Sequence, residues 1–162
     1  MSQTAIHPAD VTDELLATYE TVIGLEVHCQ LLTESKLFTR DFNIFGTEPN
    51  TNIGPLTIAL PGTLPKVNKK AVEYAIRLGI ACGCSISKRT IFDRKNYFYP
   101  DLPKGYQISQ DKKPICEQGG VHISFKHDGK FMEKTIRFHH IHLEEDAGKS
   151  VHDGSHTETM LD

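Results

Sequence analysis

The sequence contains no tryptophan, and it has few cysteines, few methionines and no long apolar run. Nowhere does an apolar stretch approach the roughly 18 residues that a membrane-spanning helix needs. Residues 1–18 also lack the basic stretch and apolar core of a secretion signal. These absences argue against a membrane protein, and we expect a cytoplasmic one. The 162 residues, of which 38% are hydrophobic and 24% charged, suffice for one globular domain.

The cysteines and histidines do not form a recognisable zinc pattern. Only Cys82 and Cys84 are close in sequence, and no second pair lies at zinc-site spacing. We therefore expect reduced thiols that are mostly buried. The last third of the chain is rich in histidine, and we expect most of these side chains at the surface or in a hairpin: His139, His140, His142, His152 and His156.

The formal charge of −3 is distributed unevenly along the chain. Residues 86–113 hold seven Lys or Arg against three Asp, whereas residues 142–162 hold six acids against Lys149. Local fields therefore matter more than the total charge. That both stretches are ordinary solvated surface stays open as the alternative.

The pattern of apolar residues predicts one helix among several strands. Alternation from Thr21 to Leu32 predicts a strand with one buried and one polar face. Turn formers between Thr33 and Pro65 predict irregular structure with short strands. Asn68 is placed to cap a helix that ends before Gly83.

A β-hairpin is predicted in the second half of the chain. Residues 121–125 alternate, His127-Asp128-Gly129 supplies a turn, and alternation resumes from Thr135 to Leu143. The fold class is therefore α+β, with a mixed or antiparallel β-sheet and few helices. Residues 1–18 are expected to be a flexible extension, with a short amphipathic stretch around residues 11–17.

The stretch from Phe92 to Tyr106 has the densest mixture of charged residues, aromatic residues and turn formers in the chain. Cations suit phosphate groups and aromatic faces suit bases, so this stretch is a candidate nucleotide site. Its candidate side chains are Arg94, Lys95, Tyr97, Tyr99 and Lys104. A packed aromatic turn with surface ion pairs is the structural alternative.

Glu26 and His28 are candidate ligands of one metal ion. Strand alternation would place them on the same face, with their Cα atoms about 6 to 7 Å apart. A simple hydrogen bond on a solvated face is the alternative. The acidic residues 144–146, at the end of another predicted strand, can supply a third ligand. Oxygen ligands suit Mg²⁺, whereas the imidazole equally favours zinc or manganese.

Three segments together resemble a known family, the B subunits of aspartyl/glutamyl-tRNA amidotransferases. They are Tyr19–Leu32 with Ile23-Gly24-Leu25-Glu26-Val27-His28, Phe92–Tyr106 with Asp93-Arg94-Lys95, and Arg137–Lys149 with Leu143-Glu144-Glu145-Asp146-Ala147-Gly148-Lys149. The resemblance runs from Tyr19 to Asp162. It implies that residues 19–162 are the N-terminal part of a cradle-shaped catalytic domain, truncated at Asp162.

The resemblance also implies an activity, an ATP-dependent carbon–nitrogen ligase. The complete enzyme phosphorylates the side-chain carboxylate of Glu-tRNA(Gln) or Asp-tRNA(Asn) with ATP and then amidates it with ammonia. Mg²⁺ and ATP are the implied cofactors. The implied partners are the amidase A subunit, the small C subunit and the tRNA.

Site residues follow from the same resemblance. It implies that Glu26, His28 and Glu145 bind Mg²⁺ as part of the catalytic site, and that Lys95 stabilises charge on the transferring phosphoryl group. The implied nucleotide contacts are Arg94, Lys95, Tyr97 and Lys149. Strict alternation from Ile136 would instead place Glu144 on the face of His140 and His142, so the choice between Glu144 and Glu145 stays open.

One region departs from part of that family. Zinc-bearing members have cysteine pairs around the positions of Phe38–Asp41 and Gly54–Leu60, and this chain has none there, so we expect no structural zinc. Hydrogen bonds and the packing of Leu56, Ile58 and Leu60 are expected to hold this region instead. The alternative to an enzyme is a non-catalytic module that binds tRNA or a partner protein through residues 93–113, or a scaffold.

Overall fold

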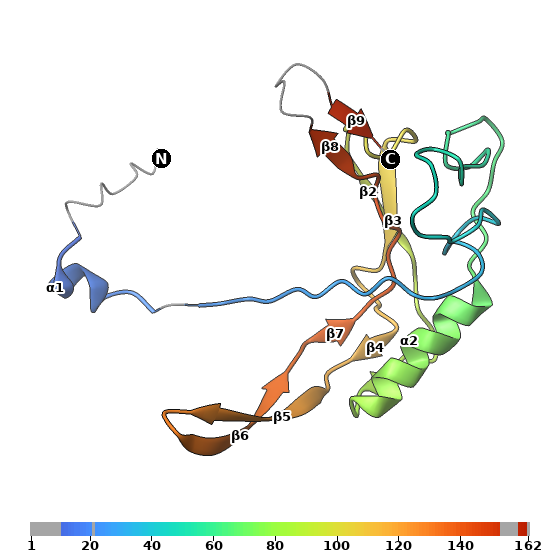
Figure 1. Ribbon diagram of the computed structural model, residues 1–162. Coiled ribbons are helices and arrows are strands. Elements are labelled where there is room, and N and C mark those ends of the chain that lie inside the picture. The colour runs from blue at the N-terminus through green and yellow to red at the C-terminus, as the bar shows by residue number, and fades with distance from the viewer. Residues whose placement is uncertain (1–10, 21, 153–158, 162) are drawn as a thin grey trace. The chain divides into compact units, whose positions relative to one another are not determined.

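The computed structural model describes residues 11–20, 22–152 and 159–161. The chain divides into two units, Met1–Gln30 and Leu31–Asp162, and each is described by itself. Small antiparallel sheets and few helices confirm the predicted α+β class (Figure 1). In the described residues, no helix is both long and apolar enough to cross a membrane.

Over residues 11–20 and 22–30, the first unit contains one short helix and a segment without regular structure. The helix α1 (Asp13–Leu16) begins after Thr12, whose Oγ1 accepts a hydrogen bond from Leu15 N at 3.2 Å. It lies in the stretch predicted to be amphipathic. The expected boundary after residue 18 stays a prediction, and residues 1–10 of the expected extension lie outside the described residues.

The strand predicted from Thr21 to Leu32 is wrong. No strand is formed over residues 22–32, and Figure 1 shows this segment without an arrow. Ile23, Leu25 and Val27 are 78%, 86% and 88% exposed. Alternating apolar and polar residues suit the two faces of a β-sheet, but a strand also needs a neighbouring strand to pair with its backbone N–H and C=O groups.

The second unit contains the predicted helix, α2 (Lys69–Ala81). Asn68 is its N-cap: Oδ1 accepts from Lys70 N at 2.9 Å, and Nδ2 donates to Ser35 O at 2.9 Å. The helix ends at Ala81, with Cys82 as its C-cap, before Gly83 at φ +65°. Gly79 allows a close approach, because a Cβ there would lie 2.4 Å from Cys116 Sγ.

The buried face of α2 packs on a small sheet of order β1-β4-β7, formed by β1 (Ser85–Ile86), β4 (Cys116–Glu117) and β7 (His140–Ile141). The core beneath it is formed by Ala75, Ile115, Cys116 and Leu143. Burial raises the pKa of the Cys116 thiol, which keeps it protonated. Only Cys116 is buried, however; Cys82 and Cys84 are half-buried and Cys29 is exposed, so the prediction of mostly buried thiols was too broad.

A second core lies beside the antiparallel pair β2 (Asp93–Asn96) and β3 (Tyr106–Ser109). Ile108 of β3 packs there with Phe38 and Leu56 from the irregular region. Residues 33–65 form turns and one isolated bridge, Ser35 with Phe42, so the predicted irregular structure is confirmed, whereas the short strands expected within it are not formed. Leu56 is buried as expected, whereas Ile58 and Leu60 are 46% and 48% exposed.

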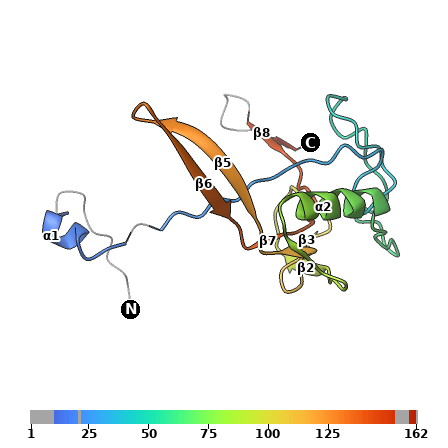
Figure 2. The same ribbon diagram turned by 90° about the horizontal axis from the view of Figure 1, so that it is seen from below.

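The predicted hairpin is confirmed as β5 (Gly120–His127) and β6 (Lys130–Arg137) (Figure 2). Asp128 and Gly129 form its two-residue turn with φ of +48° and +77°, as hairpin turns of this length require. The strand predicted from Thr135 to Leu143 breaks after Arg137, and the chain re-enters a different sheet at β7. A further pair follows, β8 (Ser150–His152) with β9 (Thr159–Leu161).

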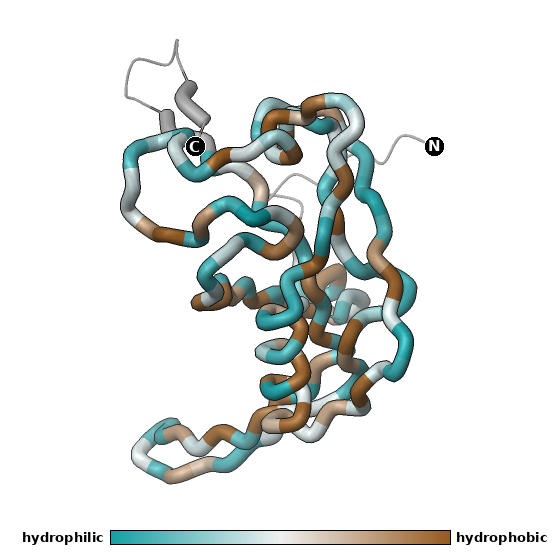
Figure 3. The backbone as a smooth tube through the Cα atoms, turned by 90° about the vertical axis from the view of Figure 1, so that its right-hand side faces the viewer, coloured by the Kyte–Doolittle hydropathy of each residue, from teal (hydrophilic) through white to brown (hydrophobic). Residues whose placement is uncertain are grey.

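Along the hairpin, apolar and polar residues alternate (Figure 3). The apolar side chains of one face nevertheless remain 37–46% exposed: Val121, Ile123, Phe125, Met132 and Ile136. No residue of either strand is buried. The hairpin is therefore held by its own pairing and turn rather than by a core.

Candidate functional site

The register of β2 and β3 divides the predicted nucleotide residues between two faces. Lys95 lies opposite Gln107, and Arg94 lies opposite Ile108. Because successive residues of a strand point to opposite faces, Lys95 shares a face with Gln107 and Ser109. Arg94 shares the other face with Tyr106 and Ile108.

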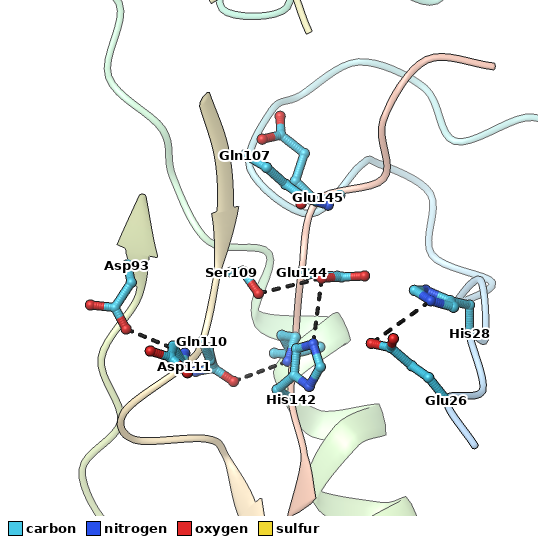
Figure 4. Close-up of polar contacts among 11 residues, drawn as sticks. Glu26, His28, Asp93, Gln107, Ser109, Gln110, Asp111, His142, Glu144 and Glu145 are labelled. Carbon is cyan, nitrogen blue, oxygen red and sulfur yellow. Dashed lines mark hydrogen bonds and ion pairs between the residues drawn. The ribbon is translucent and has the colours of Figure 1, made fainter. Parts of the chain in front are cut away.

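Lys95 is exposed on its face. Next to this face, Ser109 Oγ donates to Glu144 Oε2 at 3.4 Å, and His142 Nε2 lies 3.4 Å from the same oxygen (Figure 4). The side chains of His142 and Glu144 are 22% and 24% exposed. This side of the strand pair therefore presents a cation, a hydroxyl, a carboxylate and an imidazole.

Arg94 and Lys104 lie against the ring of Tyr106 on the other face. Arg94 Cζ is 4.5 Å and Lys104 Nζ 5.4 Å from the ring centroid. Such contacts hold a guanidinium or an ammonium by its attraction to the aromatic face. Arg94, predicted to contact nucleotide, thus lies on a different face from Lys95.

Glu145 closes the free edge of β3 with both its backbone and its side chain. Its N–H donates to Ile108 O at 2.9 Å, and its Oε2 accepts from Ile108 N at 3.3 Å. Gln107 Nε2 donates to the Glu145 carbonyl at 2.7 Å. Lys104 Nζ lies 2.6 Å from the other carboxylate oxygen.

The loop between β2 and β3 is tied to the same segment. Tyr97 OH donates to Asp101 Oδ2 at 3.1 Å, and Gly148 N donates to Asp101 O at 2.8 Å. Burial, followed by the hydrogen bond to Asp101, raises the pKa of Tyr97 to about 12. Among the described residues, Asp101 Oδ1 is buried without a hydrogen-bond partner. Lys149 is exposed just beyond this tie.

Glu26 and His28 lie near each other in the first unit, outside any strand. His28 Nε2 is 4.0 Å from Glu26 Oε1, and the two side chains are 67% and 71% exposed. Within either unit, the described residues contain no group of three or more His, Cys, Asp or Glu that is suited to a metal ion. The predicted metal set joins these two residues to Glu145 of the second unit, so the complete set stays a prediction.

Several polar residues of this region were missed in the sequence. Gln110 is 2% exposed; its Oε1 accepts from Leu143 N at 3.0 Å, and its Nε2 donates to Thr90 Oγ1. Ser109 and Gln107 hold the 144–145 segment. The alternation of Gln107 and Ser109 around Ile108 was the available signal, because it marks one polar and one apolar face.

The two turns around Phe38–Asp41 and Gly54–Leu60 are joined by protein contacts. Thr57 Oγ1 donates to Asp41 Oδ2 at 3.2 Å. Phe38 and Leu56, which flank these residues, share one buried cluster. Gly54 leaves room for the carboxylate, since a Cβ there would overlap Asp41 Oδ1. Packing and hydrogen bonds therefore connect the two turns.

Comparison with known proteins gives consistent matches. A profile of the GatB/GatE catalytic domain matches residues 21–162. The B subunit of the aspartyl/glutamyl-tRNA(Asn/Gln) amidotransferase from Leptospira biflexa is 59% identical over 134 residues, which are 83% of this chain and 27% of that protein. The protein of the same name from Bdellovibrio bacteriovorus is 54% identical over 139 residues, 86% of this chain and 28% of that protein. The protein of the same name from Nitrosospira multiformis is 54% identical over 144 residues, which are 89% of this chain and 29% of that protein. The chain thus spans less than a third of the length of these relatives.

Proposed function

Since this chain belongs to the GatB/GatE catalytic domain family, we propose that it forms part of the catalytic domain of a tRNA-dependent amidotransferase B subunit. The observation that carries the proposal is identity of 54–59% to B subunits over more than four-fifths of the chain. The geometry adds support, because Lys95, Ser109 and Glu144 lie along one side of the β2–β3 pair.

The proposed reaction has two steps. A side-chain carboxylate oxygen of Glu-tRNA(Gln) or Asp-tRNA(Asn) attacks the γ-phosphorus of ATP, and ADP leaves. Ammonia then attacks the carbonyl carbon of the resulting acyl phosphate, phosphate leaves with the bonding electron pair, and the nitrogen releases a proton to give the amide. Activation is needed because a carboxylate has no good leaving group, whereas an acyl phosphate has one.

Two anions must approach each other in the first step. We assign the exposed Lys95 ammonium to the transferring phosphoryl group, whose negative charge a fixed cation stabilises. Lys149 is a second exposed cation, beyond the Gly148–Asp101 tie. Tyr97 keeps its phenolic proton over the whole physiological range, so it acts as a hydrogen-bond donor rather than as a base.

The implied Mg²⁺ fits the chemistry of the available donors. Glu26 and His28 lie 4.0 Å apart and exposed, and the 144–145 segment offers two carboxylates. We propose that Glu26, His28 and one acid of this segment hold the ion. The family pattern names Glu145, but Lys104 and Ile108 N engage both of its carboxylate oxygens, so we assign Glu144 as the third ligand. When bound, Mg²⁺ would neutralise charge on the phosphate oxygens.

The partners follow from the same proposal. Ammonia would come from an amidase A subunit, with a small C subunit completing the enzyme, and the aminoacylated tRNA would be the substrate. Large apolar side chains at the surface favour a larger assembly; among them, Phe45, Leu64 and Phe98 are 96%, 80% and 100% exposed.

The test is Glu26→Gln in the complete amidotransferase. The substitution removes a charged metal ligand but keeps the size of the side chain, so ATP-dependent formation of Gln-tRNA or Asn-tRNA should fall below about 1% of the unmodified rate, while glutamine hydrolysis by the amidase continues. Glu133→Gln on the exposed strand β6 is the control and should retain both activities. Unchanged tRNA amidation by Glu26→Gln would reject the assignment of Glu26 to the metal.

A second candidate function, an RNA-binding module without catalysis, is favoured by one observation. Exposed cations occupy two turns that are joined by hydrogen bonds from Ile91 N and Thr90 Oγ1 to Lys113 O; they are Lys88, Arg89, Lys112 and Lys113. Such a patch suits a phosphodiester backbone. Lys95→Ala and Lys112→Ala would then weaken tRNA binding equally, whereas the amidotransferase proposal expects Lys95→Ala to lower amide formation at saturating tRNA.

A further inference from the structure

Lys104 differs from the other cations of the candidate site in its burial. Its side chain is 4% exposed, whereas Lys95 and Arg94 are exposed. Its Nζ lies 2.6 Å from Glu145 Oε1, and that carboxylate is itself only 16% exposed. A buried ammonium so close to a buried carboxylate is neutralised within the protein.

Both oxygens of the Glu145 carboxylate are engaged inside the fold. Oε1 pairs with Lys104, and Oε2 accepts the N–H of Ile108. The Glu145 N–H donates in turn to the Ile108 carbonyl. The residue therefore acts as a substitute for a neighbouring strand at this edge of β3, with a carboxylate oxygen in place of a backbone carbonyl.

The position of Glu145 determines the direction of its neighbour. Successive side chains of an extended segment point to opposite sides. With Glu145 directed to Ile108 and Lys104, the Glu144 carboxylate lies by Ser109 Oγ and His142 Nε2 (Figure 4). Ser109 belongs to the same face of β3 as Gln107, the partner of Lys95.

We propose that Lys104 and Glu145 are a positioning pair, which holds the 143–148 segment on β3 so that Glu144 lies on the Lys95 side. Lys104 acts through Glu145 and does not contact the nucleotide. The inference rests on the proposed function for what Glu144 and Lys95 do, but the pair itself rests on the contacts above.

A direct phosphate contact by Lys104 is the competing role. A cation that binds phosphate must exchange part of its hydration shell for phosphate oxygens. The Lys104 side chain has almost no exposed surface at which this exchange could occur. The two roles also differ in their response to the loss of Glu145. Removing one partner of a buried pair leaves an uncompensated charge, whereas replacing both by neutral residues is often tolerated.

The experiment is a double-mutant cycle in the complete amidotransferase, with Lys104→Met, Glu145→Gln and the double variant. The amide that Glu145→Gln introduces keeps an oxygen for the Ile108 N–H but loses the charge. Lys126→Met on the exposed hairpin is the matched control. Steady-state kcat and KM for ATP-dependent amidation are measured, together with Mn²⁺ affinity by electron paramagnetic resonance and the melting temperature.

We expect Lys104→Met to lower kcat/KM about 100-fold and to weaken Mn²⁺ binding, and the double variant to recover at least about tenfold of both losses. Lys126→Met should match the unmodified enzyme. Equal impairment of Lys104→Met and the double variant would overturn the proposal in favour of a direct contact. A fall in melting temperature with unchanged kcat/KM and Mn²⁺ affinity would overturn it in favour of a purely structural pair.

The same measurements separate this inference from the proposed function. If the unmodified enzyme shows no ATP-dependent amidation, the proposed function fails. The cycle in Mn²⁺ affinity still tests the pair, because rescue there supports it and absence of rescue overturns it. If amidation is present without rescue, only the positioning pair fails.

Discussion

The molecule contains two antiparallel strand pairs that differ in what surrounds them. The β5–β6 hairpin has eight-residue strands and a tight turn, yet no buried residue. The β2–β3 pair has four-residue strands, but Ile108 is 4% exposed and the 144–145 segment closes its free edge. The shorter pair is therefore the more strongly anchored one. The length of two paired strands follows from the local sequence, whereas their anchoring to the rest of the protein depends on segments that are distant in the sequence.

The contrast extends to charge. On the hairpin, Lys126 lies 6.0 Å from the Phe131 ring centroid, and both side chains are exposed. Beside β3, Lys104 is buried against Glu145 at 2.6 Å. Exposed pairs of this kind contribute at most about 1 kcal/mol. Of these two contacts, the buried pair is therefore the one that constrains the position of a distant segment, residues 143–148.

The largest expected difference between the two strand pairs is in the free energy of unfolding that is lost when one isoleucine is replaced by alanine. Ile108→Ala should lower the free energy of unfolding by about 3 kcal/mol, because it leaves a cavity beside Phe38 and Leu56. Ile123→Ala on the hairpin, where the side chain is 37% exposed, should cost less than about 1 kcal/mol. Urea unfolding followed by circular dichroism measures both, since the chain has no tryptophan for fluorescence. Equal losses would contradict the contrast.

A smaller effect is expected at the turn glycines. Gly129 and Gly105 have φ of +77° and +72°, a region that costs alanine about 1 kcal/mol. In Gly129→Ala, faster hydrogen exchange should stay within β5 and β6. In Gly105→Ala it should spread to β2 and β3, because Gly105 O accepts from Tyr97 N. Faster exchange in β2 and β3 from Gly129→Ala would show that the two pairs are coupled.

The effect that is smallest near neutral pH concerns the ionisation of Tyr97. Because the folded state raises the pKa of Tyr97 from 10 to about 12, it binds the phenolic proton more tightly than the unfolded chain does. The free energy of unfolding is therefore unaffected below pH 10 and falls as pH rises from 10 to 12.

Ultraviolet absorbance of tyrosinate measures this titration directly. One of the five tyrosines should ionise late, and Tyr97→Phe should remove that phase. Tyr99→Phe, which alters a residue that is 57% exposed, is the control and should leave the late phase in place. A late phase that survives in Tyr97→Phe would assign the raised pKa to another residue.

Elements defined by nearby residues could be predicted from the sequence. The Asn68 cap and helical spacing located α2, and the Asp128-Gly129 turn located the hairpin. In both cases, the residues that give the signal lie within or next to the element that they specify. The division of residues 135–143 between β6 and β7 was missed, because alternation continues through the change of sheet.

The rest required knowledge of pairing partners. Thr21–Leu32 has strand alternation, but alternation alone supplies no hydrogen-bonding neighbour, and residues 22–32 form no strand. Similarly, Arg94 and Lys95 are adjacent in β2 and so point to opposite faces, but only the register with β3 shows which residues lie opposite each of them. The burial of Lys104 against Glu145 joins residues 41 positions apart, a separation that no local pattern encodes.

The alternation at Glu144 and Glu145 has a consequence for insertions and deletions. One residue added or lost between Leu143 and Glu145 would reverse the directions of the two acidic side chains. Glu145 would then point away from Ile108, and Glu144 would point away from Ser109. The length of this stretch is therefore fixed although it contains no regular structure. At the tip of the β5–β6 hairpin, where no core depends on the turn, paired extensions of the two strands would be tolerated.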